Sequence, residues 1–207
     1  MMKQKLAIYG AGTIGSMLLT SPSYKEHLKK FDVVGFIDDE KKGRYAGIEI
    51  LGGAEKLPDL RKNGVENIIV GFSTNPIKRL DVCEHLEKLD FSFPSFTGEL
   101  PMYTKIGKGV YIDISATMLG TYQHIDDFCV IGSHTTIESE AMLKRGVIVS
   151  PHSFVGARSE VGEATVLLPY SGCKPETKIG KHCIVGPQVF LRKDVKNGAR
   201  VVSNREK

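Results

Sequence analysis

Apolar residues recur at every sixth position through the second half of the chain. The register is unbroken from Ile125 to Leu191, and a small or slender residue stands four positions after each apolar one. A period of six fits neither a helix, which repeats every 3.6 residues, nor an ordinary strand, which alternates every two. It predicts a solenoid in which each hexapeptide forms one short strand, three form a triangular coil, and coils stack at the inter-strand spacing. The apolar positions are Ile125, Ile131, Ile137, Leu143, Val149, Val155, Val161, Leu167, Cys173, Ile179, Val185 and Leu191.

Irregularities in this register predict local features of the solenoid. Glycines that directly follow apolar positions, such as Gly132 and Gly186, are expected at the sharp corners of the coils. The pattern over residues 106–118 runs one residue out of phase, so a one-residue insertion within residues 119–124 is expected to form a bulged corner. Past Leu191 the sequence departs from the repeat, as the cap of a solenoid commonly does.

The first 95 residues alternate apolar strands with helical stretches. A strand over residues 5–9 leads into a glycine turn, Gly10 to Gly15, and then into a helix over 16–20 that the Ser21-Pro22-Ser23 break ends. This alternation predicts a small parallel α/β domain over residues 1–95. A linker is expected at 94–103, and the solenoid domain spans 104–207. Further strands are expected at 33–37, 65–72 and 91–93, a flap with a short β element at 41–57, and helices at 24–30 and 76–89, the last begun by Asn75-Pro76.

The glycine turn and the acidic pair Asp38-Asp39 are the candidate ligand-binding features of this domain. Glycines let backbone N–H groups approach a phosphate, which the N-terminus of the following helix favours electrostatically. Carboxylates at the end of a second parallel strand commonly meet a ribose or base, and the alternative is a solvated acidic turn. Because the domain is short, a mononucleotide-sized ligand fits better than a dinucleotide.

Composition indicates a globular cytosolic protein. No apolar run approaches the roughly 20 residues of a membrane span, and the N-terminus lacks the apolar region of a signal peptide. The four cysteines show no metal-binding spacing and are expected to be small buried residues in a reducing compartment.

The formal net charge of +4 is unevenly distributed, with nine Lys or Arg against three acidic residues from Lys174 onward. This basic end either attracts a phosphate-rich molecule such as coenzyme A or is simply solvated. Neither an aromatic platform nor a basic helix accompanies it, so nucleic acid is not an expected partner.

The register resembles the left-handed β-helix of hexapeptide-repeat acyltransferases. With both halves included, the chain resembles the sialic acid O-acetyltransferase and UDP-4-amino-sugar N-acetyltransferase family. That resemblance implies a Rossmann-like domain that binds a nucleotide-sugar, followed by a homotrimeric β-helix that binds acetyl-CoA between subunits. The matching stretches are Gly10-Ala11-Gly12, residues 34–39, Ile50-Leu51-Gly52, Val149-Ser150-Pro151, Leu168-Pro169, residues 179–186 and Lys193-Asp194-Val195.

The resemblance also implies a set of site residues. The nucleotide-sugar is expected at Gly10, Gly12, Thr13, Ile14, Asp38 and Asp39, and acetyl-CoA at Ala157, Lys174 and Arg192. The family's general base is a histidine followed by an acidic residue, and gap-free threading from Val149 places this pair on Ser139 and Glu140. The acidic partner is kept and the histidine is lost. A second family histidine falls on Ile148.

The missing histidine bears on the reaction. A neutral sugar amine can attack a thioester directly if it is well oriented, whereas a hydroxyl needs its proton removed as it attacks. Either N-acetylation is favoured over O-acetylation, or another group supplies the base.

Other histidines could supply it. His134 and His152 are 18 residues apart and should stack on one outer face, as catalytic candidates or as ordinary surface histidines. Glu140 similarly either serves the reaction or belongs to a charged ladder with Arg158 and Glu176. His124 and His182 are weaker candidates for the base, and His27 and His85 are expected to be solvent-facing on helices.

Three hypotheses for function follow. The first is a trimeric, acetyl-CoA-dependent acetyltransferase that acts on a nucleotide-linked amino sugar in surface-glycan synthesis. The second is a catalytically silent relative that binds a nucleotide-sugar as a scaffold or regulator. A γ-class carbonic anhydrase shares the solenoid, but the spacing of His124, His134 and His152 does not match its zinc ligands, so no metal is expected.

Overall fold

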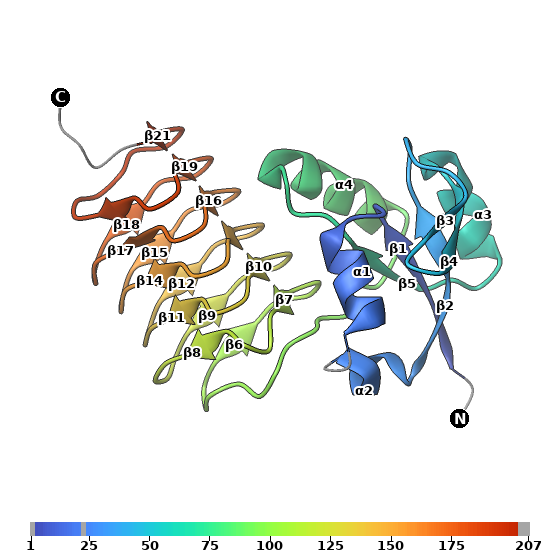
Figure 1. Cartoon of the computed structure of the whole chain (residues 1–207), viewed down its shortest axis with the longest axis horizontal. Coiled ribbons are helices and arrows are strands. Elements are labelled where there is room, and N and C mark those ends of the chain that lie inside the picture. Colours follow the sequence, from blue (N-terminus) through green and yellow to red (C-terminus); the bar gives the residue numbers. More distant parts are fainter. Residues whose placement is uncertain (1–2, 22–23, 203–207) are drawn as a thin grey trace. The chain divides into compact units, whose positions relative to one another are not determined.

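The computed structural model describes residues 3–21 and 24–202, and the chain divides into two compact units, residues 1–94 and 95–207. Figure 1 shows an α/β unit followed by a stack of triangular coils. The predicted fold class, a Rossmann-like α/β domain and a left-handed parallel β-helix, is confirmed.

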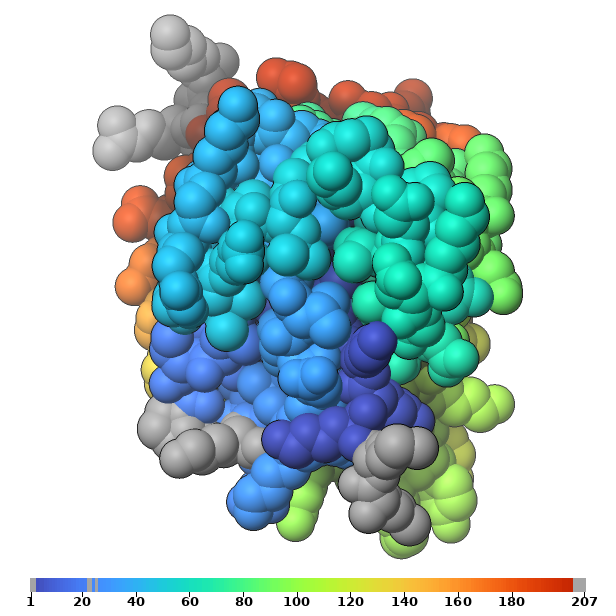
Figure 2. Space-filling model, turned by 90° about the vertical axis from the view of Figure 1, so that its right-hand side faces the viewer, coloured from blue at the N-terminus to red at the C-terminus, as the bar shows by residue number. Residues whose placement is uncertain are grey.

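The first unit is built on a sheet with the strand order β3-β4-β2-β1-β5, parallel except for the β3–β4 hairpin. In Figure 2 the segments that include β3, β4 and α3, coloured light blue to cyan, form a continuous surface of this unit. The elements are β1 (Gln4–Tyr9), α1 (Thr13–Thr20), α2 (Lys25–Leu28), β2 (Phe31–Ile37), β3 (Arg44–Tyr45), β4 (Ile48–Gly52), the 3₁₀ helix η2 (Ala54–Lys56), α3 (Leu57–Lys62), β5 (Asn67–Val70) and α4 (Pro76–Lys88).

Local chemistry explains most of these boundaries. Asn75 begins α4 as predicted, because its side chain accepts a hydrogen bond from the Lys78 N–H at 3.0 Å. The expected strand at 91–93 is wrong: only one bridge forms, between Asn67 and Ser92, and Pro94 lacks the N–H needed to extend it. The sequence-based expectations also omitted α3. Residues 22 and 23 of the predicted break lie outside the described residues.

The second unit is a solenoid of three parallel sheets, with strand orders β21-β19-β16-β13-β10-β7, β20-β17-β14-β11-β8 and β18-β15-β12-β9-β6. The segment expected to be a linker pairs with it, because Phe96 forms a bridge to Tyr111. The strands are β6 (Lys105–Ile106), β7 (Tyr111–Ile112), β8 (Thr117–Met118), β9 (His124–Ile125), β10 (Val130–Ile131), β11 (Thr136–Ile137), β12 (Met142–Leu143), β13 (Ile148–Val149), β14 (Phe154–Val155), β15 (Glu160–Val161), β16 (Val166–Leu167), β17 (Gly172–Cys173), β18 (Lys178–Ile179), β19 (Ile184–Val185), β20 (Phe190–Leu191) and β21 (Arg200–Val201).

Strand pairing fixes the length of each coil. Paired residues are 18 positions apart in the middle coils, as in Leu143 and Val161. In the first coil they are 19 apart, as in Ile106 and Ile125, which confirms the predicted one-residue insertion. The departure past Leu191 is a shortened coil, because Ile179 bridges Val195 only 16 positions later.

Each coil turns through three corners. The residue three positions before the inward apolar residue is left-handed at these corners, with φ of 50 to 65° where it is not glycine, except before β8, where it is Ser115. We call the corner before β6, β9, β12, β15 and β18 the first corner. The second corner precedes β7, β10, β13, β16, β19 and β21, and the third precedes β8, β11, β14, β17 and β20. The left-handed residues are Tyr103, Tyr122, Glu140, Arg158 and Glu176 at the first corner, Gly109, Phe128, Gly146, Ala164, His182 and Gly198 at the second, and His134, His152, Tyr170 and Gln188 at the third.

The role predicted for the glycines after apolar positions is wrong. Gly132 and Gly186 are not left-handed. A Cβ on Gly132 would lie 2.8 Å from the Pro151 nitrogen, and one on Gly186 would lie 2.9 Å from the Val201 carbonyl oxygen. These positions require glycine because the next coil's backbone passes too close for a side chain.

The solenoid core combines apolar residues with buried hydroxyls, several of which are hydrogen-bonded, although Ser171 Oγ has no partner among the described residues. The small inward residues are buried, and several donate to the carbonyl 15 positions later: Thr135 to Ser150 at 3.1 Å and Thr165 to Gly180 at 2.7 Å. A buried hydroxyl left unpaired would cost about 1–3 kcal/mol. The four cysteines, Cys83, Cys129, Cys173 and Cys183, are buried free thiols, as expected.

Candidate functional site

A cavity of about 290 Å³ lies in the first unit at the carboxyl ends of β1 and β2. Open parallel sheets usually bind ligands at this edge. It brings together four of the six predicted nucleotide-sugar residues, Gly10, Gly12, Asp38 and Asp39. Its lining is Tyr9, Gly10, Ala11, Gly12, Asp38, Asp39, Glu40, Lys41, Phe72, Thr74 and Lys78.

The glycine turn leaves backbone donors at the start of α1. Gly10 has φ of +90°, and a Cβ on Gly12 would lie 2.7 Å from the Gly71 carbonyl oxygen, so both positions favour glycine. Within residues 3–21 and 24–202, the N–H groups of Thr13 and Ile14 make no hydrogen bond. Thr13 and Ile14 do not line the cavity, and the Ile14 side chain is buried, so any contact from Ile14 to a ligand is through its backbone.

Asp38 is held by three backbone donors. Its Oδ2 accepts from the Ala11 N–H at 2.7 Å, and its Oδ1 accepts from the N–H groups of Glu40 and Lys41 at 3.0 and 2.9 Å. Burial opposes ionisation, but the N–H groups of Lys41, Ala11 and Glu40 outweigh it and hold the pKa of Asp38 below its ordinary value. Asp38 therefore stays charged and fixes the glycine turn.

Asp39 is also bonded within the protein. Its Oδ1 accepts from the Ala54 N–H at 2.8 Å, and its Oδ2 accepts from the Tyr9 hydroxyl at 2.8 Å. Burial, followed by the hydrogen bond to Asp39 and its negative charge, raises the pKa of Tyr9. Tyr9 is thus a neutral hydroxyl in the wall of the cavity.

Two lysines of this cavity were not identified from the sequence. Lys41 donates to the Ala11 carbonyl at 2.5 Å and lies over the Tyr45 ring at 4.7 Å from its centroid. Lys78 stands in the first turn of α4, and its side chain is exposed. The only signal in the sequence was the helix start at Asn75-Pro76, which places Lys78 at an anion-favouring helix end.

In the solenoid, Ser139 and Glu140 lie at the first corner. Arg158 lies in the next coil and bonds Glu176 through Nε and Nη2 at 3.0 and 2.8 Å. The hydrogen bond and charge of Glu176, assisted by the charge of Glu140, raise the pKa of Arg158. Arg158 and Glu176 therefore form an ion pair, and Glu140 stands at the equivalent position one coil earlier.

His134 and His152 stack at the third corner, with ring centroids 5.0 Å apart. This confirms that they share one outer column. Within one chain, however, the third corner is not the corner of Ser139 and Glu140, so the four predicted catalytic residues do not form a single site in the chain.

The residues expected to contact acetyl-CoA lie close to the first corner. Ala157 follows Ser139 by one coil, and its N–H donates to the Glu138 carboxylate at 2.8 Å. Lys174 and Arg192 are exposed and follow β17 and β20 at equivalent positions in adjacent coils. Arg205 and Lys207 of the basic end lie outside the described residues.

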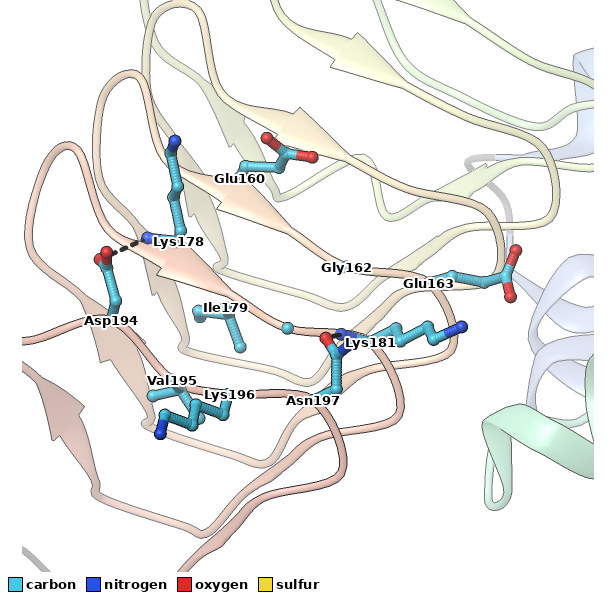
Figure 3. A pocket seen from close by; sticks show the side chains of 11 residues that line it. Glu160, Gly162, Glu163, Lys178, Ile179, Lys181, Asp194, Val195, Lys196 and Asn197 are labelled. Atoms are coloured by element: carbon cyan, nitrogen blue, oxygen red, sulfur yellow. Dashed lines mark hydrogen bonds between the residues drawn. The ribbon is translucent and has the colours of Figure 1, made fainter.

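A larger cavity, of about 610 Å³, opens on the last coils. It contains Lys178, Lys181 and Lys196, whose side chains point in three different directions in Figure 3. Asp194 accepts from the Lys178 N–H at 2.9 Å, and Asn197 accepts from the Lys181 N–H at 3.0 Å. Because its lysines diverge and Glu160, Glu163 and Asp194 share the lining, this cavity is not a compact anion site.

Among the residues that the structure describes, no three or more His, Cys, Asp or Glu side chains are grouped as metal ligands would be. Among residues 3–21 and 24–202 there is also no helix with the length and hydropathy of a membrane span.

The fold defines a hexapeptide-repeat protein with a Rossmann-like α/β unit at its N-terminal end. Residues 5–85 match the family of PglD N-terminal domains, which confirms the resemblance inferred for that unit. Bifunctional protein GlmU from Clostridium botulinum is 33% identical over 97 residues, which are 42% of this chain. The chain spans about a fifth of the length of the curated relatives it matches, 21% in this case.

Solved structures share the fold over the whole chain. A point mutant of perosamine N-acetyltransferase from Caulobacter crescentus was solved in complex with CoA and GDP-perosamine. It has a TM-score of 0.86 and 18% identity, covering 98% of this chain and 95% of that one. The acetyltransferase domain of PglB from Neisseria gonorrhoeae, solved with acetyl coenzyme A, has a TM-score of 0.87 and 21% identity, covering 99% and 98%.

Proposed function

We propose that this protein transfers an acetyl group from acetyl-CoA to the amine of a nucleotide-linked amino sugar. The observation that carries the proposal is the likeness, over 98% of the chain, to an N-acetyltransferase solved with CoA and GDP-perosamine. The nucleotide is held in the first unit at the glycine turn, and the acyl donor is held along the solenoid beside Ala157, Lys174 and Arg192. We expect a homotrimer that acts in the cytosol on precursors of surface glycans.

An amine acceptor depends less on a base than a hydroxyl acceptor does, which favours N-transfer. Ser139 is a poor base, and its Oγ already lies 3.4 Å from the Leu119 carbonyl oxygen. A sugar amine brings its own lone pair, so orientation alone contributes several kcal/mol, whereas a hydroxyl acceptor depends on a base.

Turnover tests the proposal directly. The full chain is incubated with acetyl-CoA and with GDP-, UDP- and dTDP-linked amino sugars, and free CoA is followed with a thiol reagent. We expect release with at least one amine acceptor and none with the matching hydroxyl sugars. No release with any acceptor, under conditions where an active N-acetyltransferase gives a signal, contradicts acetyl transfer.

A silent relative is the second candidate, and two observations favour it. Serine occupies the position of the family histidine, and the Ala157 N–H is already paired with Glu138. Such a protein binds the nucleotide-sugar as a scaffold or regulator. Calorimetry separates the two candidates, because a silent relative binds the nucleotide-sugar and not acetyl-CoA.

A further inference from the structure

A third cavity, of about 530 Å³, lies at the first corner of the first coils, and we call it the tyrosine pocket. It spans the insertion bulge and the neighbouring coils of the sheet β6-β9-β12. Glu140, which adjoins Ser139, is part of its wall. The lining residues are Tyr103, Lys105, Tyr122, Gln123, His124, Glu140, Met142 and Arg158.

Two exposed tyrosines form one side of this pocket. The rings of Tyr103 and Tyr122 stack with centroids 4.9 Å apart and planes 7° apart. Their exposed fractions are 61% and 58%, so a broad aromatic surface faces water within this chain. Such a surface stacks well against the apolar face of a pyranose ring, with the hydroxyl groups free to bond elsewhere.

A histidine with a carboxylate partner stands in the same pocket. His124 Nε2 lies 3.0 Å from Asp126 Oδ1. The two residues are two positions apart where β9 ends and share a face. This contact favours the tautomer in which Nε2 carries the proton, with Nδ1 as the acceptor. Nδ1 makes no hydrogen bond with any residue that the structure describes.

The insertion bulge connects this histidine to the position of the missing one. The Glu140 N–H donates to the Thr121 carbonyl at 3.0 Å, and the Ser139 hydroxyl donates to the Leu119 carbonyl at 3.4 Å. A Cβ on Gly120 would collide with Ser139 Oγ. The insertion bulge, residues 119–124, thus packs against the first corner where Ser139 lies, and its last residue is His124.

We propose that His124, oriented by Asp126, is the general base of acetyl transfer, and that the tyrosine pocket holds the sugar of the acceptor. This rests on the proposed function. The amine nitrogen attacks the thioester carbonyl carbon, forming the N–C bond. Nδ1 of His124 takes one proton from that nitrogen as the C–S bond breaks. The thiolate then receives the proton from the imidazolium, giving the amide and CoA.

The remaining histidines of the solenoid lack one or more of these features. His134 and His152 stack on each other at the third corner. His182 has a carboxylate neighbour, Glu163, but the N–O separation is 3.8 Å, beyond hydrogen-bond range, and it stands at the second corner. His182 therefore makes a matched control, being similarly exposed and beside a carboxylate.

The test compares His124→Asn, Asp126→Asn and His182→Asn in the full chain, with the acceptor that the wild type uses fastest. We expect His124→Asn to lower kcat about 100-fold with an unchanged KM for acetyl-CoA, since general bases contribute about 10²- to 10⁴-fold. For the wild type, log kcat/KM for the acceptor should rise with pH on the acid side with a slope of about two, because both the amine and the base must be deprotonated. For His124→Asn the slope should be about one, because only the amine contributes. Asp126→Asn should lose about tenfold and keep the steeper slope. His182→Asn should match the wild type.

Activity of His124→Asn within twofold of the wild type, with the slope unchanged, overturns the base assignment while leaving acetyl transfer intact. A wild type without turnover overturns both. The acceptor site is tested without turnover, by calorimetry with GDP-perosamine and a UDP-linked 4-amino sugar. Tyr122→Leu should weaken binding about tenfold relative to Tyr170→Leu, which removes an exposed tyrosine from another corner. If the two variants bind the nucleotide-sugars equally well, the tyrosine pocket does not hold the sugar of the acceptor.

Discussion

The rings of His152 and Tyr170 lie parallel within 3°, with centroids 4.8 Å apart, in successive coils of the third corner. His134 stacks on the other side of His152 at 5.0 Å, so one imidazole is held between two rings. Spacing and parallelism both follow from the stacking of identical turns.

The first prediction concerns this stack. His152→Ala removes both ring contacts and should lower the free energy of unfolding by about 1 kcal/mol, because each exposed aromatic contact contributes at the low end of about 0.5–1.5 kcal/mol. Urea unfolding followed by circular dichroism measures it. His182→Ala, which removes an imidazole without a ring partner, is the control, and equal losses in the two variants would mean that the stack contributes nothing.

Gly120 provides a second prediction on stability. Gly120→Ala and Gly198→Ala both put a side chain on a left-handed residue, at φ of +82° and +72°. At Gly198 the new Cβ meets nothing within 4 Å, so only the conformational cost of about 1 kcal/mol applies. At Gly120 the Cβ collides with Ser139 Oγ, and we expect about 2–3 kcal/mol in total. Adding Ser139→Gly should recover the difference, and failure to recover it would show that the contact is not the cause.

Lys78 yields a third prediction, on the nucleotide. If the cavity of the first unit holds a diphosphate, Lys78→Ala should weaken GDP and UDP binding about tenfold, as expected for losing one charge-assisted hydrogen bond. The loss should shrink in about 0.5 M salt. Lys88→Ala, at the other end of α4, serves as the control, and calorimetry gives the constants. Equal affinities for the two variants would place the phosphates elsewhere.

Asp38 predicts a dependence of stability on pH. Because its pKa is held below the ordinary value, its charge stabilises the fold above the unfolded-state pKa of about 3.9, and this contribution is lost as the pH falls through the native pKa. The wild type should therefore exceed Asp38→Asn in free energy of unfolding above about pH 5, and the gap should narrow toward pH 3. Denaturation at several pH values measures it. Glu40→Gln, an exposed neighbour, should show little gap at any pH, and a constant gap for Asp38→Asn would contradict the charge as its origin.

Ser139 separates two accounts of the missing histidine. With His124 as the base and the bulge packed beneath the corner, Ser139→His should change kcat by no more than about threefold, although a correctly placed base contributes about 10²-fold or more. Steady-state kinetics across pH would show this. A large gain would instead mean that the chain lost its base at position 139 and did not replace it.

The sequence predicted the fold well because the solenoid repeats one rule. Inward positions such as Ile137 and Thr135 must be apolar or small in every coil, so the six-residue pattern recurs many times along the sequence. The insertion before His124 was visible as a phase change for the same reason. Local turn rules do not explain the glycine positions, because close approach between coils depends on residues 15 to 19 positions away.

The site was predicted less completely. Asp38 and Asp39 were located, but their partners were not, because Tyr9 and Ala54 come from other elements of the sheet. From the sequence His124 is only a weaker candidate, since nothing in its own hexapeptide reveals the close contact with Asp126 or Tyr103 as a neighbour from the preceding coil. The third-corner histidines were paired correctly, but the sequence distance to Ser139 concealed that they stand on a different corner.

Both changes in coil length fall at the first corner: one extra residue before His124 and a shortening before Val195. Strands on either side keep their pairing, so an insertion or deletion there alters a turn without shifting any buried residue. This divides the molecule into a part that must stay constant and an edge whose length is free to vary. If the tyrosine pocket holds the acceptor as proposed, a few changed residues at this one edge are enough to alter the acceptor in a relative with the same solenoid.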